Sequence, residues 1–162
     1  MGSELSSEYY DQFHGVEAHY RTHYRKSTYY PLFRSIVREL REVHATRILE
    51  VGCGSGVLAQ MILEQLPAAE YRGFDFSRTA VARAGERTGR KDAFFVGDAR
   101  SAAAYEYGYD AIVCTEVLEH IEDDLGAIRN WRLGVPCICS VPNFLNAEHV
   151  RAFRRESELR DR

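Results

Sequence analysis

The chain has 162 residues, with 21 basic and 24 acidic side chains, so its formal net charge is −3. A hydrophobic share of 45% and a charged share of 28% indicate one globular domain and exclude a disordered chain, a fibrous repeat and a coiled coil. The acidic excess also excludes nucleic-acid binding by bulk positive charge alone. No stretch approaches the roughly 18 continuous apolar residues of a membrane span, and no apolar run early in the sequence predicts a signal peptide.

Residues 1–28 are polar and aromatic without a regular period, and we expect the segment 1–30 to form a lid or cap. Pro31 then begins a helical pattern. The apolar residues that recur on one face of this helix are Leu32, Phe33, Ile36, Val37, Leu40 and Val43. Residues 31–162 are expected to form the main domain.

Five short apolar runs follow, and they alternate with stretches long enough for helices. This alternation predicts an α/β fold with a parallel sheet and right-handed crossovers. The expected strands are 47–52, 71–75, 93–98, 109–114 and 135–141, and the expected helices are 57–66, 78–88 and 119–131. The charged tail, 151–162, is expected to be an exposed helix with no strand after it.

The four cysteines lie in apolar or glycine-rich segments, and none forms a Cys-x-x-Cys pair typical of zinc sites. We interpret them as reduced core thiols, with Cys137 and Cys139 alternating along a buried strand. Reduced thiols fit a cytoplasmic protein. The other two cysteines are Cys53 and Cys114.

A glycine-rich loop joins the first expected strand to the helix after it. Gly52, Gly54 and Gly56 allow a tight turn and a close approach of a ligand to the backbone. Val57 stands where the dinucleotide fingerprint G-x-G-x-x-G needs glycine, and no Lys-Ser/Thr pair follows. The loop therefore favours neither NAD nor a nucleoside triphosphate, and a purely structural turn is the alternative.

Four acidic residues stand at the carboxyl ends of the first four expected strands. Ligands of open α/β sheets bind outside these ends. Such a set fits a cationic ligand rich in hydroxyls and amines better than a pyrophosphate. The four residues are Glu50, Asp75, Asp98 and Glu116.

With these motifs in the order 48–56, 73–77, 97–99 and 109–120, the sequence resembles the class I S-adenosylmethionine (SAM)-dependent methyltransferases. The resemblance implies a three-layer, Rossmann-like sandwich in which the glycine loop wraps the methionine part of SAM. It implies that Asp75 binds the ribose hydroxyls, that Phe76 lies against the adenine and that Asp98 and Ala99 meet the adenine edge. The implied cofactor-binding residues are Glu50, Gly52, Cys53, Gly54, Gly56, Asp75, Phe76, Asp98, Ala99 and Glu116.

Members of this family usually end with an antiparallel pair of strands, and the sequence shows no such pair. An uncovered sheet edge favours association. We therefore expect either a truncated chain or a partner, such as a second copy, on that edge.

A second group of residues follows the fourth expected strand. If a helix begins near Thr115, then Glu116, Glu119 and His120 share one face, and His149 could join them from the end of the fifth strand. Two carboxylates and two imidazoles could bind a divalent ion. This pattern resembles the metal-dependent small-RNA 3′-terminal ribose 2′-O-methyltransferases. Ubiquinone-pathway O-methyltransferases share the Glu-Val-Leu-Glu-His stretch. Without a metal, His120 and Glu119 would be the catalytic candidates, His120 as general base.

The composition of segment 19–41 is a clue to the methyl acceptor. This segment carries six basic residues against one acidic residue, with tyrosines between them. Such a pattern can bind single-stranded nucleic acid, but a solvated helix face behind a tyrosine lid fits the acidic chain better. We expect O-methylation of a small molecule. The alternatives are an RNA ribose 2′-O-methyltransferase and a SAM-binding module without activity.

Overall fold

The computed structural model describes residues 4–16 and 22–161. Their five strands form one sheet of order β3-β2-β1-β4-β5. All the neighbouring strands pair in parallel, so the predicted parallel α/β sheet is confirmed. The strands are β1 (Arg47–Val51), β2 (Glu70–Asp75), β3 (Phe94–Val96), β4 (Ala111–Thr115) and β5 (Cys137–Ser140).

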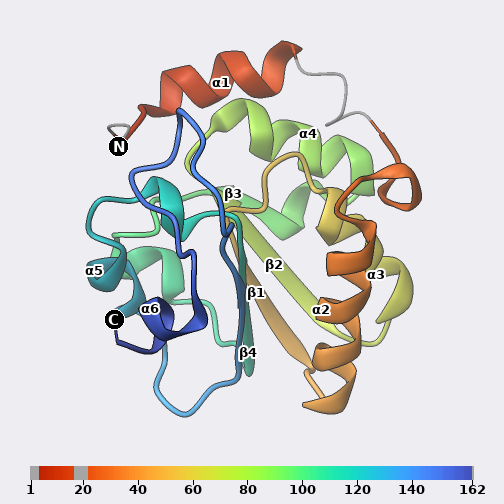
Figure 1. Cartoon of the computed structure of the whole chain (residues 1–162). Coiled ribbons are helices and arrows are strands. Elements are labelled where there is room, and N and C mark those ends of the chain that lie inside the picture. Colours follow the sequence, from red (N-terminus) through yellow and green to blue (C-terminus); the bar gives the residue numbers. More distant parts are fainter. Residues whose placement is uncertain (1–3, 17–21, 162) are drawn as a thin grey trace.

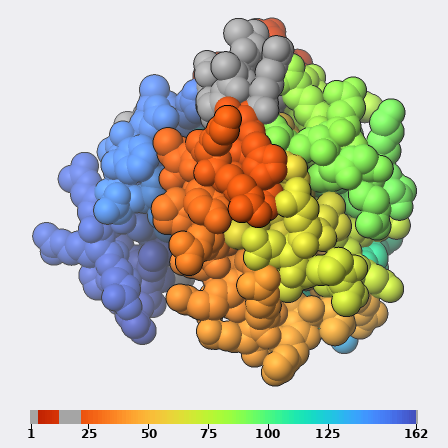
Figure 2. Space-filling model, turned by 90° about the vertical axis from the view of Figure 1, so that its right-hand side faces the viewer, coloured from red at the N-terminus to blue at the C-terminus, as the bar shows by residue number. Residues whose placement is uncertain are grey.

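Alternation along the strands separates two cores, one on each face of the sheet. On β1, Ile48 packs with the helices of one face, whereas Leu49 and Val51 pack with the short segments of the other. The first face is covered by α2 (Tyr30–Glu42), α3 (Val57–Gln65) and α4 (Arg78–Thr88), which form the continuous orange-to-green surface of Figure 2. The second is covered by η4 (Ala102–Tyr105), η5 (Leu118–His120) and α5 (Asp124–Ile128). The three-layer sandwich is confirmed, with one layer made of short helical turns.

The amino-terminal helix α1 (Ser7–Val16) was not expected. It lies across the carboxyl ends of the strands, above α4 (Figure 1). Asp11 accepts hydrogen bonds from the Ser77 hydroxyl (2.6 Å) and the Thr79 N–H (2.9 Å) at the first turn of α4. A carboxylate is favourable at that end of a helix dipole. The prediction that this region lacks a regular period was wrong, since Tyr9, Phe13 and Val16 have helical spacing.

The expected helix 119–131 is replaced by η5, a break, and the short helix α5. A continuous helix would use the carbonyls of residues 118–122 for its own hydrogen bonds. Instead, the Glu119 carbonyl accepts from Val150 N–H, and the Leu118 and Glu122 carbonyls accept from the Arg151 guanidinium. Glu116, with φ of 55°, also prevents a helix from beginning near Thr115.

Cys137 and Cys139 are exposed, so their interpretation as buried core thiols was wrong. The reason is the position of β5, which pairs only with β4 among the described strands and therefore lies at the sheet edge. Cys53 and Cys114 are buried as expected. Occupation of the open edge by a second copy stays a prediction.

After β5, the described residues form no further strand, and α6 (Glu156–Arg160) is an exposed helix, as expected. Arg151 was assigned to this exposed tail, but its side chain is only 17% exposed. Two short 3₁₀ helices, η2 (Tyr24–Lys26) and η3 (Lys91–Ala93), complete the described elements. No helix within residues 4–16 and 22–161 is long and apolar enough to cross a membrane.

Candidate functional site

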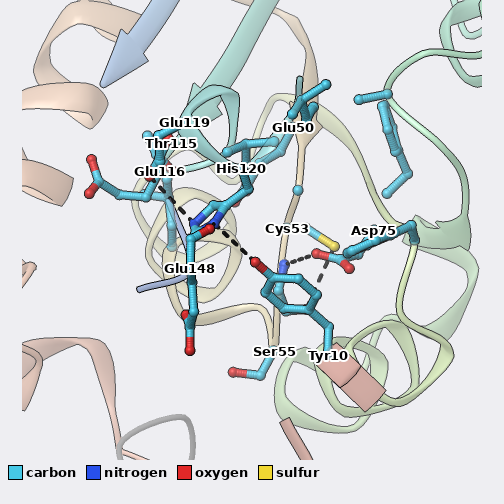
Figure 3. A pocket seen from close by; sticks show the side chains of 18 of the residues that line it. Tyr10, Glu50, Cys53, Ser55, Asp75, Thr115, Glu116, Glu119, His120 and Glu148 are labelled. Carbon is cyan, nitrogen blue, oxygen red and sulfur yellow. Dashed lines mark hydrogen bonds and ion pairs between the residues drawn. The ribbon is translucent and has the colours of Figure 1, made fainter. Parts of the chain in front are cut away.

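A cavity of about 420 Å³ opens at the carboxyl ends of the strands, a size within the range of small-molecule sites. One end is lined by the glycine loop and the residues after β2 and β3. The other is lined by the residues after β4 and β5, and Tyr10 of α1 reaches between them (Figure 3). All the sequence-predicted site residues line this cavity except Gly56: Glu50, Gly52, Cys53, Gly54, Asp75, Phe76, Asp98, Ala99, Glu116, Glu119, His120 and His149.

The glycine loop is held in a conformation that side chains rarely adopt. Gly52, Gly54 and Gly56 have φ values of 66°, 50° and 75°. A Cβ atom at Gly52 would lie 2.3 Å from Cγ2 of Val117, and one at Gly56 would lie 2.8 Å from Cα of Ala84. Gly56 therefore allows α3 and α4 to approach, which is a structural role, while Gly52 and Gly54 face the cavity.

Asp75, at the end of β2, presents a fixed carboxylate to the cavity (Figure 3). It accepts hydrogen bonds from Gly54 N–H and Ser77 N–H, both at 2.9 Å. Burial raises the pKa of Asp75 to about 6, against the lowering effect of these amides. Each carboxylate oxygen retains acceptor capacity, so the group is oriented to receive further donors such as hydroxyls.

Asp98 and Glu50 differ in their surroundings. Asp98 pairs with the Arg100 guanidinium at 2.8 Å, which holds its pKa below the usual range. Glu50 is only 2% exposed and accepts a 2.6 Å hydrogen bond from the Tyr71 hydroxyl. Burial raises the pKa of Glu50 to about 8. A cationic group bound beside Glu50 would favour its ionised form.

At the opposite end, Glu119, His120 and His149 each offer one ligand atom, and these atoms lie within 4.8 Å of one another. Glu119 is 1% exposed, and neither of its carboxylate oxygens has a hydrogen-bond partner among the described residues. Burial raises its pKa to about 8, with Glu116 adding to the effect. A buried carboxylate without donors is costly, and a divalent cation would supply the missing partner.

Glu116 lies outside this group of three. Its carboxylate accepts a 2.8 Å hydrogen bond from the Ser140 hydroxyl, although its charge still acts on Glu119 and His120. The structure thus brings together three of the four residues predicted to bind a metal, through two loops rather than along the face of one helix.

The ring of His120 is oriented by its surroundings. Nδ1 lies 2.9 Å from the Glu148 carbonyl and 3.0 Å from the Tyr10 hydroxyl. Donation from Nδ1–H to that carbonyl leaves Nε2 as the free lone pair, and Nε2 lies 3.6 Å from Oε1 of Glu119. Burial lowers the pKa of His120, which favours the neutral imidazole that a metal ion requires.

The tyrosines predicted to form the lid have different positions. Tyr24 is fully buried and donates to Glu64 at 2.7 Å, so it belongs to the core, and Tyr30 packs beside it. Tyr29 lines the cavity, whereas Tyr20 lies outside the described residues. Sequence reasoning missed Tyr10, whose ring centroid is 5.1 Å from that of Phe76. The helical spacing around Tyr10 could have revealed it.

Charged groups around the cavity are mainly acidic. Arg100 is the one Lys or Arg among the described lining residues, and it is paired with Asp98 and with Glu4 (2.7 Å). On α2, Arg38 pairs with Glu39 at 2.9 Å, and Arg41 donates to the Gln65 side chain at 2.9 Å. These contacts use some of the basic side chains of segment 19–41, which the sequence analysis considered as a nucleic-acid surface.

Comparisons with known proteins identify methyltransferases as relatives of this chain. The ubiquinone biosynthesis O-methyltransferase of Vibrio parahaemolyticus is 35% identical over 88 residues, covering 52% of this chain and 37% of that protein. The malonyl-[acyl-carrier protein] O-methyltransferase of Bacillus anthracis is 26% identical over 121 residues, covering 75% and 42%. The chain therefore spans about two fifths of the length of these relatives.

Among solved structures, the methyltransferase domain of bacterial CtHen1 has a TM-score of 0.59 and 28% identity, covering 68% of this chain and 65% of that one. The plantazolicin methyltransferase BpumL, at 22% identity and a TM-score of 0.54, shares the fold. The family model described as a methyltransferase domain matches residues 49–134, which include the glycine loop, Asp75 and η5. The chain belongs to this methyltransferase-domain family.

Proposed function

We propose that this chain binds SAM and transfers its methyl group to an oxygen of a small molecule. The observation that carries the proposal is that one cavity contains both the amide-oriented carboxylate of Asp75 and the carboxylate of Glu119, which has no hydrogen-bond donor among the described residues. The first suits a hydroxyl-rich cofactor, and the second suits a cation that activates an acceptor. Family membership and the methyltransferase relatives support the reaction type.

The residues present fit SAM. Gly52 and Gly54 line the cavity, where their backbone would meet the methionine part, Asp75 would accept the ribose hydroxyls, and Phe76 would lie against the adenine. Asp98 and Ala99 would border the adenine edge, and Glu50, which precedes the loop, and Cys53, which belongs to it, also line the cavity. SAM supplies an electrophilic methyl group on a good leaving group, so the chain's own task is mainly alignment of the partners. We further propose 1–30 as the cap and 31–162 as the SAM-binding domain.

The residues also fit a divalent cation, held by Glu119, His120 and His149, with Glu116 at its edge. Such an ion lowers the pKa of a bound hydroxyl and fixes its oxygen. Two imidazoles favour manganese, iron, cobalt or zinc over magnesium. Without the ion, His120 and Glu119, whose pKa burial raises to about 8, would be the groups that could accept the acceptor's proton.

A small acceptor is favoured over RNA because the described rim of the cavity is acidic, with Glu4, Glu116 and Glu148 among its lining residues. A phosphate backbone needs free cationic side chains. Arg100 at the rim and Arg38 on α2 are both in ion pairs. The RNA ribose alternative lacks a comparable supporting observation.

Release of S-adenosylhomocysteine tests the proposal. Hydroxylated aromatic and aliphatic metabolites would be compared with RNA 3′ ends, each with added Mn²⁺ and with EDTA. We expect turnover with a small hydroxylated acceptor and none with RNA. Calorimetric titration should show that SAM binds and that NAD does not. Binding of SAM without turnover on any acceptor would instead support a module without activity.

A further inference from the structure

We propose that Arg151 is a positioning residue for the metal site, acting by fixing the η5 turn that carries Glu119 and His120. This inference rests on the metal site proposed above. Arg151 itself lies in the segment after β5, just beyond His149. Thus one short segment would supply one ligand and also hold the turn that supplies the other two.

The contacts of Arg151 are concentrated on this turn. Its Nη1 donates to the Leu118 carbonyl at 2.9 Å and also to the Ile121 carbonyl, and its Nη2 donates to the Glu122 carbonyl at 2.7 Å. Nη1 also lies 3.0 Å from the Asp124 carboxylate, at the start of α5. A guanidinium, with several donors in a rigid plane, can bind such a set of oxygens at once, whereas an ammonium cannot.

The residues before Arg151 contact the same turn one after another. The Glu148 carbonyl lies 2.9 Å from His120 Nδ1, the ring centroids of His149 and His120 are 5.0 Å apart, and Val150 N–H donates to the Glu119 carbonyl at 2.9 Å. Figure 3 shows Glu148 beside His120. Segment 148–151 therefore bridges the loops that follow β4 and β5.

This bridge explains why η5 does not continue as a helix. The Glu119 carbonyl accepts from Val150 N–H and the Glu122 carbonyl from Arg151, and the Leu118 carbonyl accepts from Arg151 as well as from Ile121 N–H within the turn. The turn keeps Glu119 buried beside His120, with neither carboxylate oxygen hydrogen-bonded among the described residues. Without Arg151, the carbonyls of Leu118, Ile121 and Glu122 would lose this donor, and Glu119 would leave its position.

The test compares Arg151→Met and Arg151→Lys with the control Arg155→Met, an exposed arginine of the same tail. Calorimetry would measure the affinity for Mn²⁺ and, separately, for S-adenosylhomocysteine. We expect Mn²⁺ to bind about 10- to 100-fold more weakly to Arg151→Met, the usual effect of losing a residue that orients metal ligands. Arg151→Lys should be intermediate because it retains only the Asp124 ion pair. The S-adenosylhomocysteine affinity of both variants should match that of the control.

A second measurement separates this inference from the metal proposal. The imidazole ¹⁵N signals of His120, assigned through a His120→Gln variant, report which nitrogen carries the proton without any metal. We expect protonated Nδ1 in the wild type and a mixture of tautomers in Arg151→Met. If wild-type protein binds no Mn²⁺, the metal proposal fails, and the His120 signals alone decide the role of Arg151.

Unchanged His120 signals together with wild-type Mn²⁺ affinity in a folded Arg151→Met would refute the positioning role. Should circular dichroism show that Arg151→Met does not fold, Arg151→Lys decides by the same two measurements. Equality of the lysine variant with the wild type in both would then overturn the inference.

Discussion

The two ends of the cavity contain similar residue types but are built differently. At the β1–β2 end, Asp75 receives two backbone amides, and the loop that supplies one of them follows directly from a strand. At the β4–β5 end, Glu119 receives no donor among the described residues, and it is held by contacts from a segment about thirty residues away in the chain. The Asp75 carboxylate therefore has hydrogen-bond donors without a ligand, whereas the Glu119 carboxylate would gain a partner from a bound ligand.

This difference predicts that cofactor binding and methyl transfer depend on different ends of the cavity. A preorganised carboxylate at the β1–β2 end should determine cofactor affinity, and the unsatisfied cluster at the β4–β5 end should determine turnover. Variants at one end should therefore leave the property of the other end unchanged.

The largest effect is expected on turnover from the β4–β5 end. Glu119→Ala or His149→Ala should lower kcat by about 100-fold or more, since several kcal/mol of acceptor activation would be lost. SAM affinity, measured by calorimetry, should stay within twofold of wild type. EDTA should reproduce the loss, and added Mn²⁺ should reverse it.

Glu86→Ala, on the exposed face of α4, is the matched control for the loss of a carboxylate and should keep full activity. Turnover that survives EDTA, in protein from which no metal copurifies, would remove the metal from the mechanism. His120 would then be the general base to test.

The next effect concerns cofactor affinity at the β1–β2 end. Asp75→Ala should raise the Kd for SAM about 10- to 150-fold, because hydrogen bonds to a charged group contribute about 1.5–3 kcal/mol. Calorimetric titration is the measurement, and Asp92→Ala, which removes an exposed carboxylate, is the control. An unchanged Kd in the Asp75 variant would place the ribose elsewhere.

A purely structural effect is expected at Gly56. Gly56 and Gly89 have similar φ values, 75° and 68°, but only at Gly56 would an added Cβ meet the backbone of α4. Both alanine variants should lose about 1–2 kcal/mol from the left-handed conformation. Gly56→Ala should lose about 1–3 kcal/mol more from overpacking. Urea unfolding measures both, and equal losses would show that the α3–α4 approach is not tight.

The difference between the two ends of the cavity also explains which parts of the fold and of the site could be predicted from the sequence. The strands, α3 and α4 follow from local alternation and glycine spacing, and α4 was predicted with its observed bounds, Arg78–Thr88. Asp75 and the glycine loop are adjacent to the strand ends that position them, so a local pattern was enough to suggest them.

The β4–β5 end depends on contacts between distant segments, which no local pattern contains. The apolar periodicity of 119–131 favours a helix, but Arg151 and Val150 take its carbonyls. Similarly, Tyr10 reaches the site from α1, which the Asp11 contact joins to α4, about 66 residues further along the chain. Arg151 looked like one more charge in an exposed tail, and only the fold shows its role.

The smallest effect is a pH dependence of stability that arises at Glu50, behind the glycine loop. Its pKa is about 8 in the folded chain against an ordinary value of 4.5. Between these values the unfolded chain has lost the proton that the folded chain keeps, so stability falls as the pH rises toward 8 and then levels. Glu119 contributes with the same sign. Glu50→Gln should therefore unfold at a higher urea concentration than wild type at pH 9, and its midpoint should change less between pH 7 and pH 9.

Glu64→Gln is the control, because exposed Glu64 likewise accepts a tyrosine hydroxyl, and it should keep the wild-type pH dependence. A wild-type slope in Glu50→Gln would show that Glu50 is already ionised in the folded protein, with the Tyr71 hydroxyl as its donor.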